Sequence, residues 1–364
     1  TSYIHTLSLH DALPIYLADT CAKPLTLKEL LAFEKKDSLG DLMNLSLDYG
    51  VIEGSHALKK GILDLYQSGD DEEIAICHGG VNANELVLMT LLSANDHILS
   101  FLPTYQQLYS FPESLGVEVD FIHLKEENDW KIDFEELEKN IKENTKMICL
   151  NLPNNPTGTT LNHEEMQQLI QICKKHDLYV LVDEIYRGLY QEESMSDLYE
   201  KGIVTSGLSK VLSTAGLRIG WIKTKDKELI RLINERRDYS IISSGPINDY
   251  LGALTLKYSK EILTRNREIL EENKNYLKKW LKGHPHLSCV IPEYGTVCFL
   301  KYDYQIDSNT FCETLQEETG VFFVPGCCFD VENHLRFGLA NAPQLVKEGL
   351  EVFSNWLKKL DTSR

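Results

Sequence analysis

Long hydrophobic runs and an excess of positive charge are both missing from this sequence. No apolar stretch approaches the roughly 20 residues that a membrane-spanning helix requires, so we expect no membrane association. The 37 Lys and Arg residues are outnumbered by 55 Asp and Glu residues, which gives a net charge of −18. Because nucleic acids are bound by surfaces rich in Lys and Arg, this balance argues against a nucleic-acid partner. It still allows a local basic patch for an anionic cofactor.

Paired cysteine motifs are missing as well. The nine cysteines are scattered without a CxxC pair, and several lie in apolar runs, as Cys149 does in the run 147–150. Isolated thiols in such runs are typical of buried residues in a reducing compartment rather than of a disulfide framework or a zinc site. We therefore expect a cytoplasmic protein without a metal centre.

The chain is long enough for more than one domain, and its apolar content of 43% suits a sizeable core. Between about residues 74 and 222, short apolar runs alternate with helical patterns, which is typical of βα units around a mostly parallel sheet. We predict an α/β fold with a large domain over 46–240 and a smaller domain made of 16–45 and 241–364. Residues 1–15 lack the basic segment and cleavage site of a signal peptide, and we expect a non-native or disordered leader there.

One strand–helix–strand unit is visible in the apolar pattern. The runs 146–150 and 178–182 are typical of buried strands. Between them, Asn162 precedes Glu165 by three residues, which is the pattern of a capping box at the start of a helix. The residues that then recur on one helical face are Met166, Leu169, Ile170 and Cys173.

Polar residues follow three of the predicted strands at their carboxyl ends. The turn Asn-Asn-Pro-Thr-Gly at 154–158 follows the first strand, and Asp-Glu-Ile-Tyr at 183–186 follows the second. Ser209 and Lys210 come shortly after a third predicted strand at 203–205. Ligands of open α/β sheets bind beyond the carboxyl ends of the strands. We therefore expect these three segments to contribute side chains to one site.

Taken together, these segments resemble the signature blocks of the class I and II aminotransferases, which depend on pyridoxal 5′-phosphate (PLP). The matching blocks are 49–54, 103–105, 154–158, 183–186, 209–221 and 335–337. The resemblance covers about residues 16–360. It implies the PLP-dependent transferase fold of type I, with a mostly parallel mixed sheet flanked by helices and a smaller α/β domain. It also implies PLP as the cofactor.

The resemblance assigns the chemistry to a few residues. Lys210 is implied to hold PLP as a Schiff base and, once freed, to carry the proton at the substrate Cα. Asp183 is implied to pair with the pyridine nitrogen, which makes the ring a better electron sink. Asn155 and Tyr186 are implied to hydrogen-bond the phenolic oxygen, with Tyr186 counted among the catalytic residues. Tyr105 is implied to stack on the ring face.

The phosphate group needs cationic and backbone donors. Arg218 matches the phosphate arginine of the family, and the start of a helix offers backbone N–H groups at its positive end. The residues of that helix start are Gly80, Val81 and Asn82. The position three before Lys210, often Ser or Thr in the family, is Gly207 here. Either Ser206 or Ser209 is then expected to replace it.

Two further assignments concern the partner subunit and the substrate. Tyr49 is implied to reach the phosphate of a neighbouring subunit, so the resemblance implies a homodimer with active sites at the interface. Arg336 is implied to bind the substrate α-carboxylate as a two-pronged donor, assisted by Asn155. Lys59 stands where many relatives carry arginine, and the sequence indicates no role for it.

We predict an aminotransferase that moves an amino group from an L-amino acid to a 2-oxo acid by a ping-pong mechanism. One alternative is another PLP enzyme of the same fold, such as a C–S lyase or an amino-acid cyclase or synthase, because one carbanion leads to all these products. A second is a non-catalytic sensor domain, which the complete set of implied residues disfavours. A second arginine in the pocket would indicate dicarboxylic substrates. Spacing alone does not place there any of Arg187, Arg231, Arg236 and Arg237.

Replacing Lys210 tests this assignment. We expect Lys210→Ala to abolish turnover and the Schiff base, because Lys210 is the residue implied to supply the reactive amine. PLP is still expected to bind without a covalent link. The measurements are the turnover rate and the visible absorbance of the bound cofactor, and an active Lys210→Ala protein would overturn the mechanism.

Overall fold

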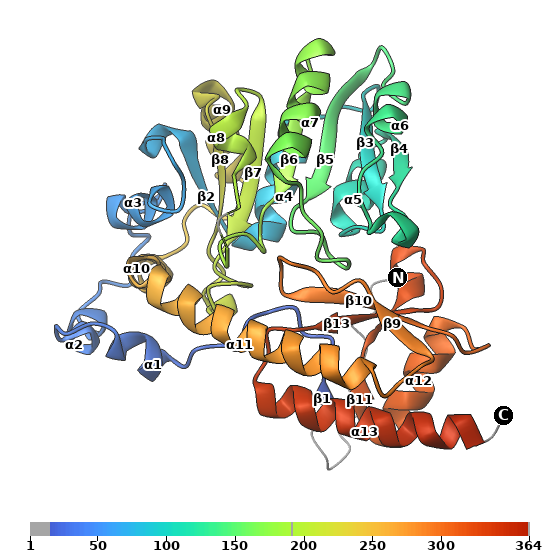
Figure 1. Ribbon diagram of the computed structural model, residues 1–364. Coiled ribbons are helices and arrows are strands. Elements are labelled where there is room, and N and C mark those ends of the chain that lie inside the picture. The colour runs from blue at the N-terminus through green and yellow to red at the C-terminus, as the bar shows by residue number, and fades with distance from the viewer. Residues whose placement is uncertain (1–14, 191, 363–364) are drawn as a thin grey trace.

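A computed structural model describes residues 15–190 and 192–362, and its strands form three separate sheets (Figure 1). Residues 1–14 of the predicted leader lie outside the described part of the chain. Ile15, which we also assigned to the leader, instead begins strand β1 (Ile15–Tyr16). This strand pairs in parallel with β11 (Val321–Phe322), so the N-terminal segment joins elements near the other end of the chain.

The largest sheet has seven strands. Their spatial order is β2 (Ile74–Cys77), β8 (Gly220–Thr224), β7 (Gly202–Gly207), β6 (Tyr179–Asp183), β5 (Thr145–Asn151), β3 (His97–Leu102) and β4 (Glu118–His123). The ladders from β7 to β4 are parallel, whereas β8 runs antiparallel to both of its neighbours. The predicted α/β fold with a mostly parallel mixed sheet is confirmed.

Helices cover both faces of this sheet, which explains why its strands are apolar on both sides. Strand β5 shows the alternation: Met147 and Cys149 belong to the core on one face, and Ile148 and Leu150 to the core on the other. The helices on the first face are α4 (Gly79–Leu91), α5 (Gln107–Ser114) and α9 (Lys227–Arg237). Those on the second face are α6 (Phe134–Lys139), α7 (His163–Lys175) and α8 (Met195–Leu198).

Helix α7 begins where the sequence predicts it. The Asn162 side chain accepts a hydrogen bond from the Glu165 backbone N–H at 2.9 Å, and the Glu165 carboxylate accepts one from the Asn162 backbone at 2.9 Å. This capping box satisfies two N–H groups that the first helical turn cannot satisfy itself. The predicted strands on either side of the helix are confirmed as β5 and β6.

A smaller antiparallel sheet lies below the large one in Figure 1. Its strands in order are β12 (Val324–Pro325), β13 (His334–Gly338), β10 (Val297–Tyr302) and β9 (Leu287–Cys289). It shares a core with α12 (Ser308–Thr319) and α13 (Pro343–Thr362). Aromatic side chains fill that core, as where Tyr302 stacks on Phe311 with ring centroids 4.4 Å apart and Phe311 meets Trp356 edge-on.

The remaining elements connect or flank the two sheets. They are the helices α1 (Leu27–Ala32), α2 (Ser38–Met43), α3 (His56–Leu63), α10 (Pro246–Lys257) and α11 (Ser259–Leu281), and the 3₁₀ turns η1 (Asp71–Glu73), η2 (Glu126–Asn128), η3 (Ala215–Leu217) and η4 (Gly326–Phe329). Lys59 is buried on α3 and donates to the Asp71 carbonyl at 3.1 Å.

Within the residues that the structure describes, no helix combines the length and apolar content needed to cross a membrane. The division into 46–240 and the flanking segments stays a proposal.

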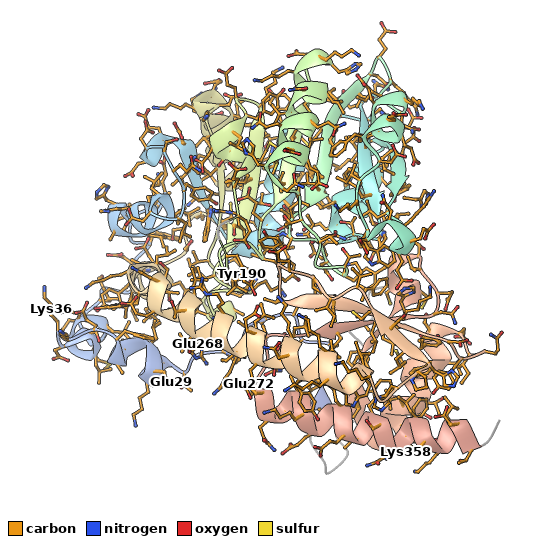
Figure 2. All side chains as sticks on the ribbon, in the orientation of Figure 1. Glu29, Lys36, Tyr190, Glu268, Glu272 and Lys358 are labelled. Atoms are coloured by element: carbon orange, nitrogen blue, oxygen red, sulfur yellow. The ribbon has the colours of Figure 1, made fainter. Side chains whose placement is uncertain are left out.

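Helix α11 connects the large sheet to the smaller sheet through the buried side-chain amides of two asparagines. The Asn266 side chain donates to the Val211 carbonyl and to the Ser213 hydroxyl, both at 2.7 Å, and so holds the loop that follows Lys210. Farther along α11, Asn273 is bonded to the segment that leaves β13. Tyr190, labelled in Figure 2, adds a hydrogen bond to Glu271 on the same helix.

We expect Asn266→Ala to lower the free energy of unfolding by about 2–3 kcal/mol, because it leaves a buried carbonyl and hydroxyl without their donor. Urea denaturation measures this change. The matched control is Glu268→Ala on the exposed side of the same helix (Figure 2), which should change stability by less than about 0.5 kcal/mol. Equal effects of the two substitutions would contradict the anchoring role of Asn266.

Candidate active site

A cleft of about 760 Å³ opens beyond the carboxyl ends of β5, β6 and β7, between the two sheets. Its volume is in the usual range for small-molecule sites, about 300–1,000 Å³. Ten of the twelve predicted site residues line it. They are Gly80, Val81, Tyr105, Asn155, Asp183, Tyr186, Ser209, Lys210, Arg218 and Arg336.

The other two predicted residues, Asn82 and Tyr49, do not line this cleft. Asn82 lies on the first turn of α4, but its side chain lines a separate surface hollow with Leu232 and Tyr239. Its amide oxygen accepts from the His78 N–H at 3.1 Å. Successive helical residues point about 100° apart, so neighbours of Gly80 need not share its direction. Tyr49 is 63% exposed, in the loop before α3.

Lys210 lies in the loop after β7 and is covered by the N-terminal segment. Its Nζ donates to the Thr20 hydroxyl at 2.6 Å and lies 3.7 Å from the Cys21 sulfur. The Ala22 N–H bonds to the Lys210 carbonyl at 2.8 Å. Burial disfavours the ammonium form, but the nearby Tyr186 and Cys21 outweigh it, so the pKa of Lys210 is raised above its ordinary value. The sequence carried no signal for the contacts with Thr20 and Cys21.

Asp183 is a buried carboxylate at the end of β6. It accepts hydrogen bonds from Asn84 Nδ2 at 2.8 Å and from the Ile185 N–H at 3.0 Å. Burial raises the pKa of Asp183 to about 6, because these bonds and the charge of Lys210 offset only part of the desolvation. Among the described residues it has no ion-pair partner, so this site could hold a cationic N–H group. Asn84 was missed, although a polar residue in the apolar run of α4 was a signal for it.

An anion-binding corner is formed by Arg218 and the amino end of α4. Gly79 has φ +80°, and a Cβ there would lie only 2.5 Å from the Arg218 guanidinium. The glycine therefore allows the arginine to approach the positive end of the helix. The only side-chain hydrogen bond of Arg218 within the described residues goes to the Ala215 carbonyl at 3.1 Å. These donors could hold a phosphate group.

The structure distinguishes the two serines that could assist at this corner. Ser209 lines the cleft, whereas Ser206 does not and donates to the Glu184 carbonyl at 3.3 Å. A Cβ at Gly207 would lie 2.9 Å from the Ile219 carbonyl oxygen. The backbone of the neighbouring strand therefore leaves no room for a serine or threonine at position 207.

Arg336 enters the cleft from β13 of the smaller sheet. Its guanidinium donates to Asn155 Oδ1 and to the Ala18 carbonyl, both at 3.2 Å. Its Nε is buried and lacks a hydrogen-bond partner among the described residues. The guanidinium carbon lies 5.6 Å from the centre of the Phe329 ring. A planar arginine with an unused buried donor is suited to bind a carboxylate.

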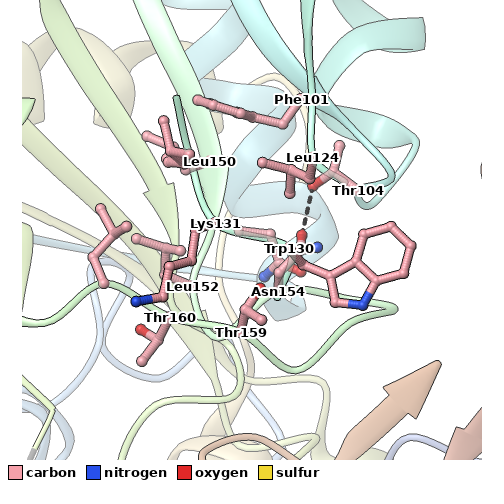
Figure 3. Close-up of a pocket in the computed structure, with 13 residues that line it drawn as sticks. Phe101, Thr104, Leu124, Trp130, Lys131, Leu150, Leu152, Asn154, Thr159 and Thr160 are labelled. Atoms are coloured by element: carbon pink, nitrogen blue, oxygen red, sulfur yellow. Dashed lines mark hydrogen bonds between the residues drawn. The ribbon is translucent and has the colours of Figure 1, made fainter. Parts of the chain in front are cut away.

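The turn that carries Asn155 is held against the loop that carries Tyr105. Figure 3 shows the bond between them: the Thr104 hydroxyl donates to Asn154 Oδ1 at 3.0 Å. Asn154 Nδ2 also donates to the Pro103 carbonyl at 3.0 Å. The cavity in this view has a volume of about 20 Å³, which is room for about one water molecule and excludes a substrate. Because its hydrogen bonds join the turn to the Tyr105 loop, Asn154 is a positioning residue for the cleft.

A model of the family described as aminotransferase class I and II matches residues 26–353. The chain belongs to this family. An aspartate aminotransferase of Bacillus subtilis is 28% identical over 328 residues, covering 84% of this chain and 82% of that protein. A capreomycidine synthase of Streptomyces vinaceus is 23% identical over 84% of this chain and 79% of its own length.

A solved structure of a similar protein has the same fold as this chain. A PLP-dependent aminotransferase from Streptococcus suis superposes with a TM-score of 0.91 at 38% identity, covering 95% of this chain and 93% of that one. The predicted family and the PLP fold type I are confirmed. Relatives named as an aminotransferase and as a synthase both match this chain, so the activity has to be argued from the site.

The raised pKa of Asp183 gives a testable pH dependence in cofactor-free protein. A carboxyl pKa raised from 3.8 to about 6 means that the folded state holds the proton more tightly than the unfolded chain. Its contribution to the free energy of unfolding, about 3 kcal/mol, is therefore present below about pH 4 and lost as the pH rises through about 6. Asp183→Asn should remove this part of the pH dependence. Urea unfolding at both ends of the window measures it, and identical profiles for the two proteins would contradict the assignment.

Proposed function

We propose that this protein is a PLP-dependent aminotransferase that moves an amino group from an L-amino acid to a 2-oxo acid by a ping-pong mechanism. The observation that supports it most is the convergence of Lys210, Asp183 and Arg336 on one cleft. The lysine offers an amine, the buried carboxylate a partner for a cationic ring nitrogen, and the arginine a site for a carboxylate. PLP and an amino acid together present the complementary groups.

The ring of PLP would be held by four residues. Asp183, which lacks a cation partner among the described residues, would pair with the pyridine nitrogen, and Tyr105 would stack on the ring. Asn155 accepts from Arg336 through its amide oxygen, which leaves its NH₂ group to donate to the phenolic oxygen beside Tyr186. Bound PLP supplies an electron sink for the negative charge that develops at the substrate Cα.

The phosphate would occupy the corner between Arg218 and the amino end of α4. Backbone N–H groups of Gly80 and Val81 point from a helix terminus whose N-cap residue, His78, makes no capping side-chain hydrogen bond. A phosphate would satisfy these donors and balance the charge of Arg218. Ser209 lines the same cleft and would add a hydroxyl donor.

Lys210 is the group that we propose moves the proton at the substrate Cα. The Thr20 hydroxyl, 2.6 Å from its Nζ, would orient the amine. Lys210 must be neutral to accept a proton, so the charge on its amine has to be lost before this step. The N-terminal segment partly covers Lys210, and Arg336 would fix the α-carboxylate so that the Cα–H bond faces the amine.

A homodimer is part of this proposal. Exposed apolar side chains gather in the segment before α3, where Tyr49 is accompanied by others. They are Met43, Leu47, Val51 and Ile52, with exposed fractions between 39% and 82%. Several exposed apolar side chains within one short segment are typical of an interaction site. We propose that a second copy covers it and that Tyr49 then reaches the partner's phosphate corner.

The other candidate is a different PLP reaction on the same fold, as the name of the relative from Streptomyces vinaceus illustrates. The residues around Lys210 serve any reaction that begins by removing the Cα proton. What separates a transaminase is the second half-reaction, in which a 2-oxo acid takes up the amino group. The decisive measurement therefore has to follow both halves.

A two-step half-reaction screen tests the proposal. Each amino acid is added to purified holoprotein, and the visible absorbance of the bound cofactor should fall for accepted substrates and return when a 2-oxo acid is added. If no amino acid changes the absorbance, transamination is refuted. If the absorbance falls but the added amino acid is recovered as a cyclised or eliminated product, the other PLP reaction is correct.

Arg336→Lys provides the matched variant for this screen. It keeps the positive charge but loses the two-pronged geometry, so kcat/KM for amino acids should fall by about 10- to 100-fold. The absorbance of bound cofactor should remain, because Arg336 is proposed to contact the substrate rather than PLP. An unchanged kcat/KM would contradict the carboxylate-binding role.

A further inference from the structure

We propose that the substrate site selects amino acids with a cationic side chain, a guanidinium or an ammonium group, and that Asp330 is the residue that determines this specificity. The proposal rests on the proposed function, because it needs a substrate whose α-carboxylate is bound by Arg336. Asp330 would contact the side chain at the other end of that substrate.

The charged side chains that line the cleft indicate which substrate groups it can bind. Three of them, Asp183, Lys210 and Arg218, are used by the cofactor and the reacting centre, and Arg336 is used by the α-carboxylate. Among the described lining residues, one charged side chain is left over, and it is the carboxylate of Asp330. A distal carboxylate on the substrate would therefore meet an anion, which costs affinity, whereas a distal cation would be attracted.

The four arginines that spacing could not place lie outside the cleft formed by this chain. Arg187 is bound to Glu184 at 2.7 Å and to the Leu65 carbonyl at 3.2 Å. Arg231 pairs with Glu228 on the exposed side of α9. Arg236 lines the outer hollow next to Asn82, and Arg237 is buried against the Ile242 carbonyl at 2.9 Å; none of them lines the cleft.

The position of Asp330 suits the far end of a substrate. It directly follows Phe329, another lining residue, whose ring centre lies 5.6 Å from the Arg336 guanidinium carbon. Asp330 is exposed at the edge of the cleft, and within the described part of the chain its carboxylate makes no hydrogen bond or ion pair. Burial and the nearby Asp330 charge raise the pKa of Tyr109, another lining residue, to about 12.

The aromatic and apolar residues that line the cleft are suited to a long, flat cation. Tyr109 and Phe329 present aromatic surface, and Val324 adds an apolar side chain. A guanidinium or ammonium group near aromatic faces gains a cation–π attraction in addition to the ion pair. An alkyl chain would lie over the apolar part while its charged end reaches Asp330, an arrangement that a dicarboxylic acid cannot use.

The local backbone allows a conservative test. Asp330 has φ +58° and ends η4 in the left-handed region, a conformation that Asn adopts readily, so Asp330→Asn should fold normally. Asp129 is a matched control, because it ends η2 with φ +50°, is exposed, and lies outside the cleft. The two substitutions remove the same charge from the same kind of turn.

The experiment measures kcat/KM of the first half-reaction on the holoprotein with L-arginine, L-lysine, L-leucine and L-glutamate. We expect the cationic amino acids to react better than L-glutamate in the wild-type protein. Asp330→Asn should lower kcat/KM for them by about five- to tenfold, with L-leucine changed by less than about twofold. Asp129→Asn should change none of the values. A preference for L-glutamate, or an equal loss for all substrates in Asp330→Asn, would overturn the proposal.

A binding measurement separates this proposal from the proposed function. Calorimetric titration of the holoprotein uses deamino acids of similar length, which carry a guanidinium, a methyl group or a second carboxylate at the far end. Preferential binding of the guanidino acid, lost in Asp330→Asn, supports the specificity even if no amino acid is transaminated. Equal binding of all three acids would refute it even if transamination is observed.

Discussion

The parallel pairing of β5, β6 and β7 is the constraint on which the site depends. Parallel strands in register end at one edge of the sheet, and the segments that follow them therefore begin side by side. The Asn151 side chain bonds to the Asp183 carbonyl at 2.8 Å across two of these strand ends. Without this register, Asn155, Asp183 and Lys210 would have no common cleft.

The site contains buried charged groups whose loss of hydration is not fully offset by hydrogen bonds or ion pairs within the described residues. Asp183 is desolvated, and its hydrogen bonds and the charge of Lys210 offset only part of that loss, while Arg336 keeps a buried N–H without a partner among the described residues. Folding energy from the cores on both faces of the sheet must offset these unfavourable terms. A ligand of complementary charge would relieve them, which is why such residues mark a binding site rather than a structural one.

The smaller sheet and the N-terminal segment complete the cleft from the opposite side. Arg336 arrives on β13, and Thr20 covers Lys210, although these residues are far apart in the sequence. Helix α11 holds both sides through Asn266 and Asn273. The substrate end of the site is thus made by elements that differ from those of the cofactor end, so specificity can vary while the cofactor end is kept.

Local sequence predicted three strands of the large sheet, β5, β6 and β7, and the helix α7 between the first two, and ten of the twelve predicted site residues line the cleft. The apolar runs, the capping box at Asn162 and the polar residues after three strands are short-range features, and their physics acts within a few residues. The family resemblance added roles to them. The backbone N–H of Asn82 stays a predicted phosphate donor, whereas its side chain lines a separate hollow, because a motif gives the position of a residue and not the direction of its side chain.

Tertiary structure alone decided the contacts between distant segments. The bond from Asn84 to Asp183, the Thr20 hydroxyl beside Lys210, and the exposed carboxylate of Asp330 at the cleft edge each join parts of the chain that no local pattern relates. The absence of a second arginine from the described cleft was decided in the same way. Charge and burial at these points depend on which surfaces pack together, and packing is a property of the whole fold.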